Sequence, residues 1–116
     1  MTLRERQVND VTVIDVSGRI TEEDGTVLLS NTVRRLAQAG RTRLVLNLLD
    51  TPYIDSAAMG EIVRGYTTAM RLGGALKLLH ARGRVHDLLA VTRLTTVFEI
   101  FESESDALAS FTGAST

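Results

Sequence analysis

The sequence predicts an α/β fold, with a mixed, mostly parallel sheet of four to five strands and about four helices. Segments with the composition of strands alternate along the chain with segments of helical periodicity. The run at 44–49 is apolar over almost its whole length, which is typical of a strand covered on both faces of a parallel sheet. Alternating strands and helices further imply right-handed crossovers between parallel strands.

The N-terminal part predicts two strands. Residues 3–8 form a short charged run, and charged side chains on an edge strand discourage pairing with other molecules. Asn9-Asp10 indicates a turn, and residues 11–16 are rich in β-branched side chains that favour a strand. Ser17-Gly18 ends this second strand. Because the Asn9-Asp10 turn joins them directly, the two strands are expected to form a meander at one side of the sheet.

The segment before Gly40 predicts the first helix, since Gly40 suits the left-handed conformation that follows a last helical turn. Its apolar residues fall near helical spacing and are expected to form the buried side: Val27, Leu28, Val33, Leu36 and Ala37. The 44–49 strand follows and should lie at the centre of the sheet. The chain then bends at Pro52, the only proline.

A second helix is predicted from Ser56 to about Leu72, ended by Gly73-Gly74. Its expected buried stripe consists of Met59, Ile62, Val63, Tyr66 and Met70. Residues 75–79 then predict a buried strand.

The C-terminal third predicts a short helix, a strand and a last helix. Gly83 opens the short helix, and residues 97–101 alternate well enough for a strand. Ser103 is placed to cap the last helix, which Leu108 and Phe111 would seat on the domain.

Composition limits the functions that the chain can have. Its 116 residues fit one domain, 1–116, and the formal net charge of -1 argues against a general affinity for nucleic acid. The sequence contains no cysteine, which excludes thiolate metal sites and a cysteine nucleophile. It shows neither a signal peptide nor an apolar run of membrane-spanning length. A cytoplasmic protein that binds no membrane is therefore expected.

The segment 53–60 carries the functional argument. It leads from a buried strand into a helix N-terminus, where backbone N–H groups lack partners and the helix dipole is positive. Either Asp55 or Ser56 can cap this helix, and from spacing alone a cap is the simpler explanation of Ser56. A phosphate on Ser56 would add roughly -1.5 to -2 charges beside Asp55 and repel an acidic or apolar partner.

This segment resembles the Asp-Ser-Ser/Thr-Gly-Leu-Gly signature of STAS-domain anti-sigma factor antagonists, and reads Asp55-Ser56-Ala57-Ala58-Met59-Gly60. The resemblance includes Tyr53-Ile54, Gly73 to Leu78, Val85 to Leu89 and Leu94 to Phe98, and so covers almost the whole chain. It implies partner switching, in which the dephosphorylated domain binds an anti-sigma factor of the serine kinase type, frees a sigma factor and is inactivated by phosphorylation. It further implies a partner-binding surface of Asp55, Ser56, Ala57, Gly60 and, if exposed, Met59 as the anchor.

The sequence departs from the signature at the usual phosphate acceptor, which is Ala57 here. Either Ser56 accepts the phosphate instead, or the switch is lost. In the second case the domain would be a constitutive scaffold or a subunit of a larger assembly, such as a stressosome-like or lipid-transport complex. A sensor of small molecules or nucleotides would need a pocket that the sequence does not reveal, and a homodimer stays open.

The residues that could suggest a metal site or a catalytic site have simpler structural explanations. His80 and His86 are isolated and lack the spacing of a metal site, and Asp50 with Asp55 reads as a turn residue and a cap rather than a catalytic pair. The acidic residues 22–24 read as a solvated loop, although they could contact a partner. We therefore expect no enzyme activity, no metal and no cofactor.

Overall fold

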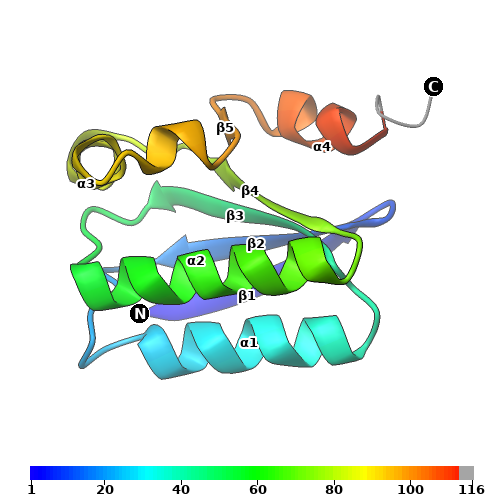
Figure 1. Cartoon of the computed structure of the whole chain (residues 1–116), viewed down its shortest axis with the longest axis horizontal. Coiled ribbons are helices and arrows are strands. Elements are labelled where there is room, and N and C mark those ends of the chain that lie inside the picture. Colours follow the sequence, from blue (N-terminus) through cyan, green and yellow to red (C-terminus); the bar gives the residue numbers. More distant parts are fainter. Residues whose placement is uncertain (113–116) are drawn as a thin grey trace.

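In the computed structural model, which describes residues 1–112, five strands form one sheet in the order β1-β2-β3-β4-β5 (Figure 1). β1 pairs antiparallel with β2, and every other neighbouring pair is parallel. The strands are β1 (Thr2–Val8), β2 (Val11–Ser17), β3 (Arg43–Asp50), β4 (Ala75–Leu79) and β5 (Ile100–Phe101). This mixed, mostly parallel sheet confirms the predicted fold class.

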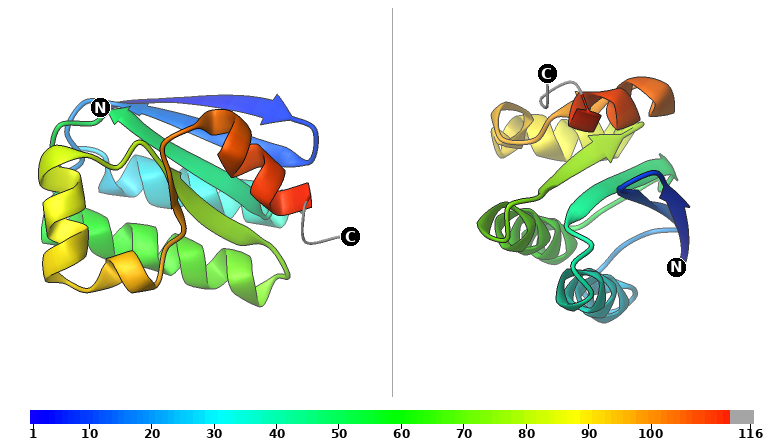
Figure 2. Two further views of the ribbon diagram at one scale, coloured as in Figure 1. Left: turned by 90° about the horizontal axis from the view of Figure 1, so that it is seen from above. Right: turned by 90° about the vertical axis from the view of Figure 1, so that its right-hand side faces the viewer.

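The helices lie on both faces of the sheet (Figure 2). They are α1 (Thr26–Gln38), α2 (Ser56–Arg71), α3 (Gly83–Val91) and α4 (Glu104–Thr112), with a short 3-10 helix, η1 (Leu94–Thr96), after α3. The buried side chains of α1, α2 and α3 belong to one core cluster, and Ala107 of α4 belongs to a second cluster on the opposite face. None of these helices within residues 1–112 has the length and apolar content needed to cross a membrane.

The central position of β3, covered on both faces of the sheet, explains why its sequence is almost continuously apolar. Leu44, Leu46 and Leu48 point into the cluster beneath α1, α2 and α3, whereas Val45 points into the cluster beneath α4. Val45 and Leu46 are both 0% exposed, as the predicted central position requires. Leu49, at the end of the strand, is 52% exposed and marks where the cover on the second face stops.

An ion-pair network holds the start of α4 to the sheet on that second face. Arg6 Nε donates to Asp15 Oδ2 at 2.7 Å, and Arg6 Nη2 donates to Glu104 Oε1 at 2.7 Å. Asn47 Nδ2 also donates to Asp15 Oδ1, at 2.9 Å. The hydrogen bonds from Arg6 are the main reason that the pKa values of Asp15 and Glu104 lie below their ordinary values.

The chain passes very close to itself where α2 leads into β4. A Cβ atom on Gly74 would lie 2.0 Å from the backbone oxygen of Thr42, which accepts a hydrogen bond from Ala75 N at 2.9 Å. Only glycine fits this contact, because every other residue would place a carbon inside a carbonyl oxygen. The predicted Gly73-Gly74 helix end is therefore also the point where the α2–β4 connection is packed against the start of β3.

Three apolar predictions were wrong. Val27 and Leu28 are 69% and 46% exposed, because the buried stripe of α1 consists of Leu29, Thr32, Val33 and Leu36. Met70 is 50% exposed, since the buried stripe of α2 ends with Gly65 and Ala69.

The last strand is shorter than the predicted 97–101. η1 lies immediately before Val97, which is 42% exposed, and Phe98 turns into the core to contact the Tyr66 ring at 5.0 Å. Pairing with β4 therefore starts only beyond Phe98. The predicted cap of α4 is confirmed, because Asp106 N donates to Ser103 Oγ at 3.3 Å.

Candidate functional site

The candidate site lies at the edge of the sheet where α1 and α2 begin, and two loops from different parts of the chain build it (Figure 1). Ile20, after β2, and Ile54, after β3, form an isolated parallel bridge. Ile20 N donates to Tyr53 O at 3.0 Å, and Asp55 N donates to Ile20 O at 3.1 Å. This bridge continues the parallel pairing beyond the two strands, so the β2–α1 and β3–α2 loops are held together.

Asp55 is the N-cap of α2 and also binds the other loop. Its Oδ1 accepts a hydrogen bond from Ala58 N at 2.8 Å, and its Oδ2 accepts one from Glu22 N at 2.8 Å. These backbone donors, that of Ala58 first, hold the pKa of the Asp55 carboxyl below its ordinary value. One oxygen of the ionised Asp55 therefore caps α2 and the other joins the two loops, which are structural tasks rather than acid–base chemistry.

Ser56 is the first residue of α2 and is exposed. The sequence left open whether Asp55 or Ser56 caps the helix, and the structure gives the cap to Asp55. Within residues 1–112 the Ser56 hydroxyl has no hydrogen-bonding partner, so it is presented to solvent at a fixed point of the helix. Ala57, at the usual acceptor position of the signature, is exposed beside it.

Met59 does not meet the condition for a partner anchor, because its side chain is only 4% exposed and packs in the core beneath α2. Ala58 and Met59 belong to the buried stripe of α2, which packs on the core. The exposed side of the first turns is instead made of Ser56, Ala57 and Gly60. Apart from the chain neighbours and the backbone of α2 itself, no atom of residues 1–112 lies within 4 Å of a Cβ built on Gly60, so this surface is low and open.

The acidic loop belongs to the same surface. Glu22, Glu23 and Asp24 are exposed, and with Arg19, Thr21 and Asp55 they line a hollow of about 380 Å³. Reciprocal backbone hydrogen bonds between Thr21 and Asp24, at 2.8 and 3.1 Å, hold the loop in a tight turn. Among the residues that the structure describes, no group of three or more His, Cys, Asp or Glu is arranged to hold a metal ion.

Sequence reasoning missed one pair at this site. The Arg19 guanidinium lies over the Tyr53 ring, 5.1 Å from its centroid. Both residues follow parallel neighbouring strands, and loops at the carboxyl ends of such strands come together at one edge of the sheet. That rule was the available signal, and it would have placed Arg19 next to the segment 53–60.

The other candidates lie elsewhere. Arg82 Nε donates to Glu102 Oε2 at 3.0 Å, and His80 Nδ1 lies 3.9 Å from the same oxygen. These residues form a small polar group beyond the end of β4. His86 and Asp50 are exposed, and the Asp55 carboxylate that would pair with Asp50 is already occupied by its two backbone donors.

A model of the STAS domain family matches residues 3–107. The chain belongs to the STAS domain family. This STAS domain is 26% identical over 101 residues to a Thermotoga neapolitana protein named as a candidate anti-sigma factor antagonist, covering 87% of this chain and 89% of that protein.

Solved structures share the fold. A candidate anti-sigma factor antagonist from Thermotoga maritima matches with a TM-score of 0.88 and 24% identity, over 94% of this chain and 93% of that one. The Bacillus cell fate determinant SpoIIAA in its phosphorylated form matches with a TM-score of 0.74 and 14% identity, over 93% and 97%. The unphosphorylated form of SpoIIAA matches with the same TM-score and identity, over 97% and 99%.

Proposed function

We propose that this chain is a single STAS domain that acts as an anti-sigma factor antagonist by partner switching in the cytoplasm, without catalysing a reaction itself. In its unphosphorylated form it binds an anti-sigma factor of the serine kinase type and frees a sigma factor. Phosphorylation of Ser56 ends that binding. The observation that carries the proposal is the exposed Ser56 hydroxyl, which is left without a structural task because Asp55 caps α2.

The surroundings of Ser56 support a switch that changes binding and leaves the fold intact. Ser56 and Ala57 lie in the first turn of α2, where backbone N–H groups and the dipole favour an anion, so a phosphate would not unfold the helix. The same phosphate would add roughly -1.5 to -2 charges next to Asp55 and the acidic loop. A partner seated on this surface would then meet a concentrated negative charge.

The shape and composition of the surface support a protein partner. Ala57 and Gly60 allow a second surface to approach the helix closely, next to Asp55 and Ser56. Tyr53, stacked under Arg19, adds an aromatic residue and an arginine, the two types that often carry binding energy at interfaces. The relatives named as anti-sigma factor antagonists support the class of partner, and a SpoIIAA solved in both phosphorylation states supports regulation by phosphate.

Phosphate transfer is the direct test. The purified protein is incubated with ATP and each of a panel of serine-kinase anti-sigma factors, and its intact mass and modified residue are determined. We expect the mass of one phosphate, mapped to Ser56, and no gain for Ser56→Ala. Phosphate mapped to another residue would refute the assignment of the site.

A binding experiment tests the switch separately. Ser56→Glu should weaken capture of the kinase that modifies the protein, because it places a charge at the centre of the contact. Thr67→Glu is the matched control, since Thr67 is exposed on the same helix about three turns further along. Equal affinities of the two variants, with unchanged circular dichroism, would count against this docking surface.

One observation favours a second candidate. Ala57 occupies the position where the resembling antagonists usually carry the acceptor hydroxyl, and it is exposed there. A constitutive STAS scaffold, as a subunit of a larger assembly, would need no acceptor. The absence of any phosphate after treatment with the whole panel would favour this candidate over the switch.

A further inference from the structure

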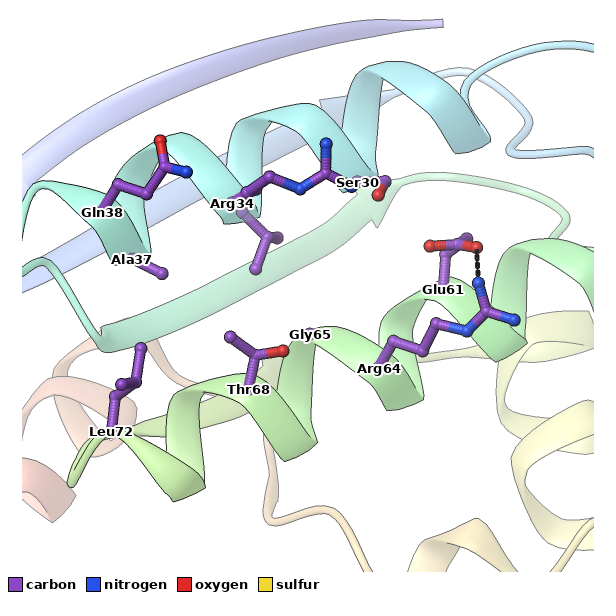
Figure 3. A pocket seen from close by; sticks show the side chains of 10 residues that line it. Ser30, Arg34, Ala37, Gln38, Glu61, Arg64, Gly65, Thr68 and Leu72 are labelled. Carbon is purple, nitrogen blue, oxygen red and sulfur yellow. Dashed lines mark hydrogen bonds and ion pairs between the residues drawn. The ribbon is translucent and has the colours of Figure 1, made fainter.

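A groove runs between α1 and α2, with a volume of about 480 Å³ (Figure 3). Small residues line its middle. Gly65 has no side chain, and a Cβ there would lie only 3.4 Å from Val33 Cγ1, so the two helices approach closely at the floor. Ala37 and Thr68 keep the walls low on either side.

One end of the groove is mainly apolar, with Gln38 as a polar residue at its rim. Ala37 of α1 and Leu72 at the end of α2 face the groove from opposite sides, as Figure 3 shows, and Val33 lies on its floor. Leu72 is 53% exposed although it lines a concave surface. Covering such a side chain with an alkyl group is favourable by roughly 25 cal/mol for each Å² of apolar surface removed from water.

The other end of the groove is positively charged. Arg64 donates to Glu61 Oε1 at 2.9 Å, whereas the only hydrogen-bonding partner of Arg34 among residues 1–112 is Asn31, at 3.5 Å, beyond the usual length of a hydrogen bond. The Arg34 guanidinium therefore keeps most of its donors for a ligand.

The net positive charge of α1 and α2 also favours an anionic ligand. Together they carry four arginines and one glutamate, and α1 has no acidic residue. The chain as a whole has a net charge of -1, so positive charge is concentrated on this layer. An anion that approaches the groove is attracted before it makes contact.

We propose that the α1–α2 groove binds a small amphiphilic anion, a carboxylate on an unbranched alkyl chain. The carboxylate pairs with the planar donor fork of Arg34, and the chain lies along the groove against Ala37 and Leu72. The volume falls within the roughly 300–1,000 Å³ of ordinary ligand pockets. This site is separate from Ser56 and does not depend on the partner-switching proposal.

Sodium decanoate, kept below its micelle-forming concentration, is the probe. It is titrated into the 15N-labelled protein, and amide shifts are followed by NMR. We expect saturable shifts confined to the residues that line the groove. Decyltrimethylammonium, which has the same chain and the opposite charge, should not produce them, and acetate, which lacks the chain, should bind far more weakly.

Variants test each half of the site. Arg34→Gln should weaken decanoate binding at least about tenfold, because a charge-assisted pair is lost. Leu72→Ser should also weaken it, whereas Arg71→Gln, which changes an exposed arginine outside the groove, should leave it unchanged. Spectra of each variant away from the groove show whether the fold is kept.

Four results would overturn the proposal. The first three are the absence of saturable shifts with decanoate, equal shifts with decyltrimethylammonium, and unchanged affinity of Arg34→Gln in a folded protein. Saturable shifts on another face of the molecule would also refute the site.

Discussion

Replacing Asp55 with alanine removes two hydrogen bonds at once, those from Ala58 N and Glu22 N, each 2.8 Å long. Loss of an N-cap costs about 1 kcal/mol. A hydrogen bond to a charged group is worth roughly 1.5–3 kcal/mol, but water can replace part of the second bond at this half-exposed site. We therefore expect Asp55→Ala to lower the free energy of unfolding by about 2 kcal/mol, or to lower the Tm by about 8 °C.

Two further variants make the prediction sharper. Asp55→Asn keeps one side-chain oxygen for Ala58 N but cannot accept from Glu22 N with its amide group, so about half of the loss is expected. Ser56→Ala should be close to neutral, because the Ser56 hydroxyl caps nothing. Urea unfolding at pH 7 followed by circular dichroism measures all three. A larger loss for Ser56→Ala than for Asp55→Ala would refute the assignment of the cap.

Two other predictions concern stability. Gly74→Ala should cost about 3 kcal/mol, because its Cβ would lie 2.0 Å from the Thr42 oxygen, whereas Gly60→Ala, in open helix, should gain roughly 0.5–1 kcal/mol in the same urea assay. Asp15 and Glu104 have pKa values held below their ordinary 3.8 and 4.5, so the native state binds fewer protons than the unfolded chain and stability falls as the pH drops through this range. Arg6→Leu should flatten that acid dependence, with its largest deficit at pH 7, and an unchanged pH profile would contradict the network.

Much of the fold could be predicted because the signals were local or strongly periodic. The apolar run at 44–49 could be satisfied only by a strand covered on both faces, and β3 is that strand. Capping residues and glycines marked the helix ends. Apart from the overlong last strand, the errors in the fold concern rotation about a helix axis, where one residue changes the direction of a side chain by about 100°. Val27 and Met70 lie just outside their buried stripes for this reason.

The candidate site could be predicted only in part. The segment 53–60 was located from its own residues, but the Glu22 amide that binds Asp55 comes from a loop more than thirty residues earlier. Backbone groups carry no residue-specific signal, so this bond could not be read from the sequence. The burial of Met59 was predicted by its place in the apolar stripe of α2, and it excludes the conditional role of Met59 as a partner anchor. The Arg19–Tyr53 contact required the strand order.

The bridge between Ile20 and Ile54 has a consequence for protein engineering. Grafting residues 53–60 alone onto another scaffold would carry over the serine but not its setting, because the Glu22 amide and the Ile20 backbone that hold Asp55 would be missing. The smallest transferable unit is a pair of adjacent parallel strands with both of their following loops. For the same reason, insertions between Ser17 and Thr26 should disturb the presentation of Ser56 as severely as changes beside it.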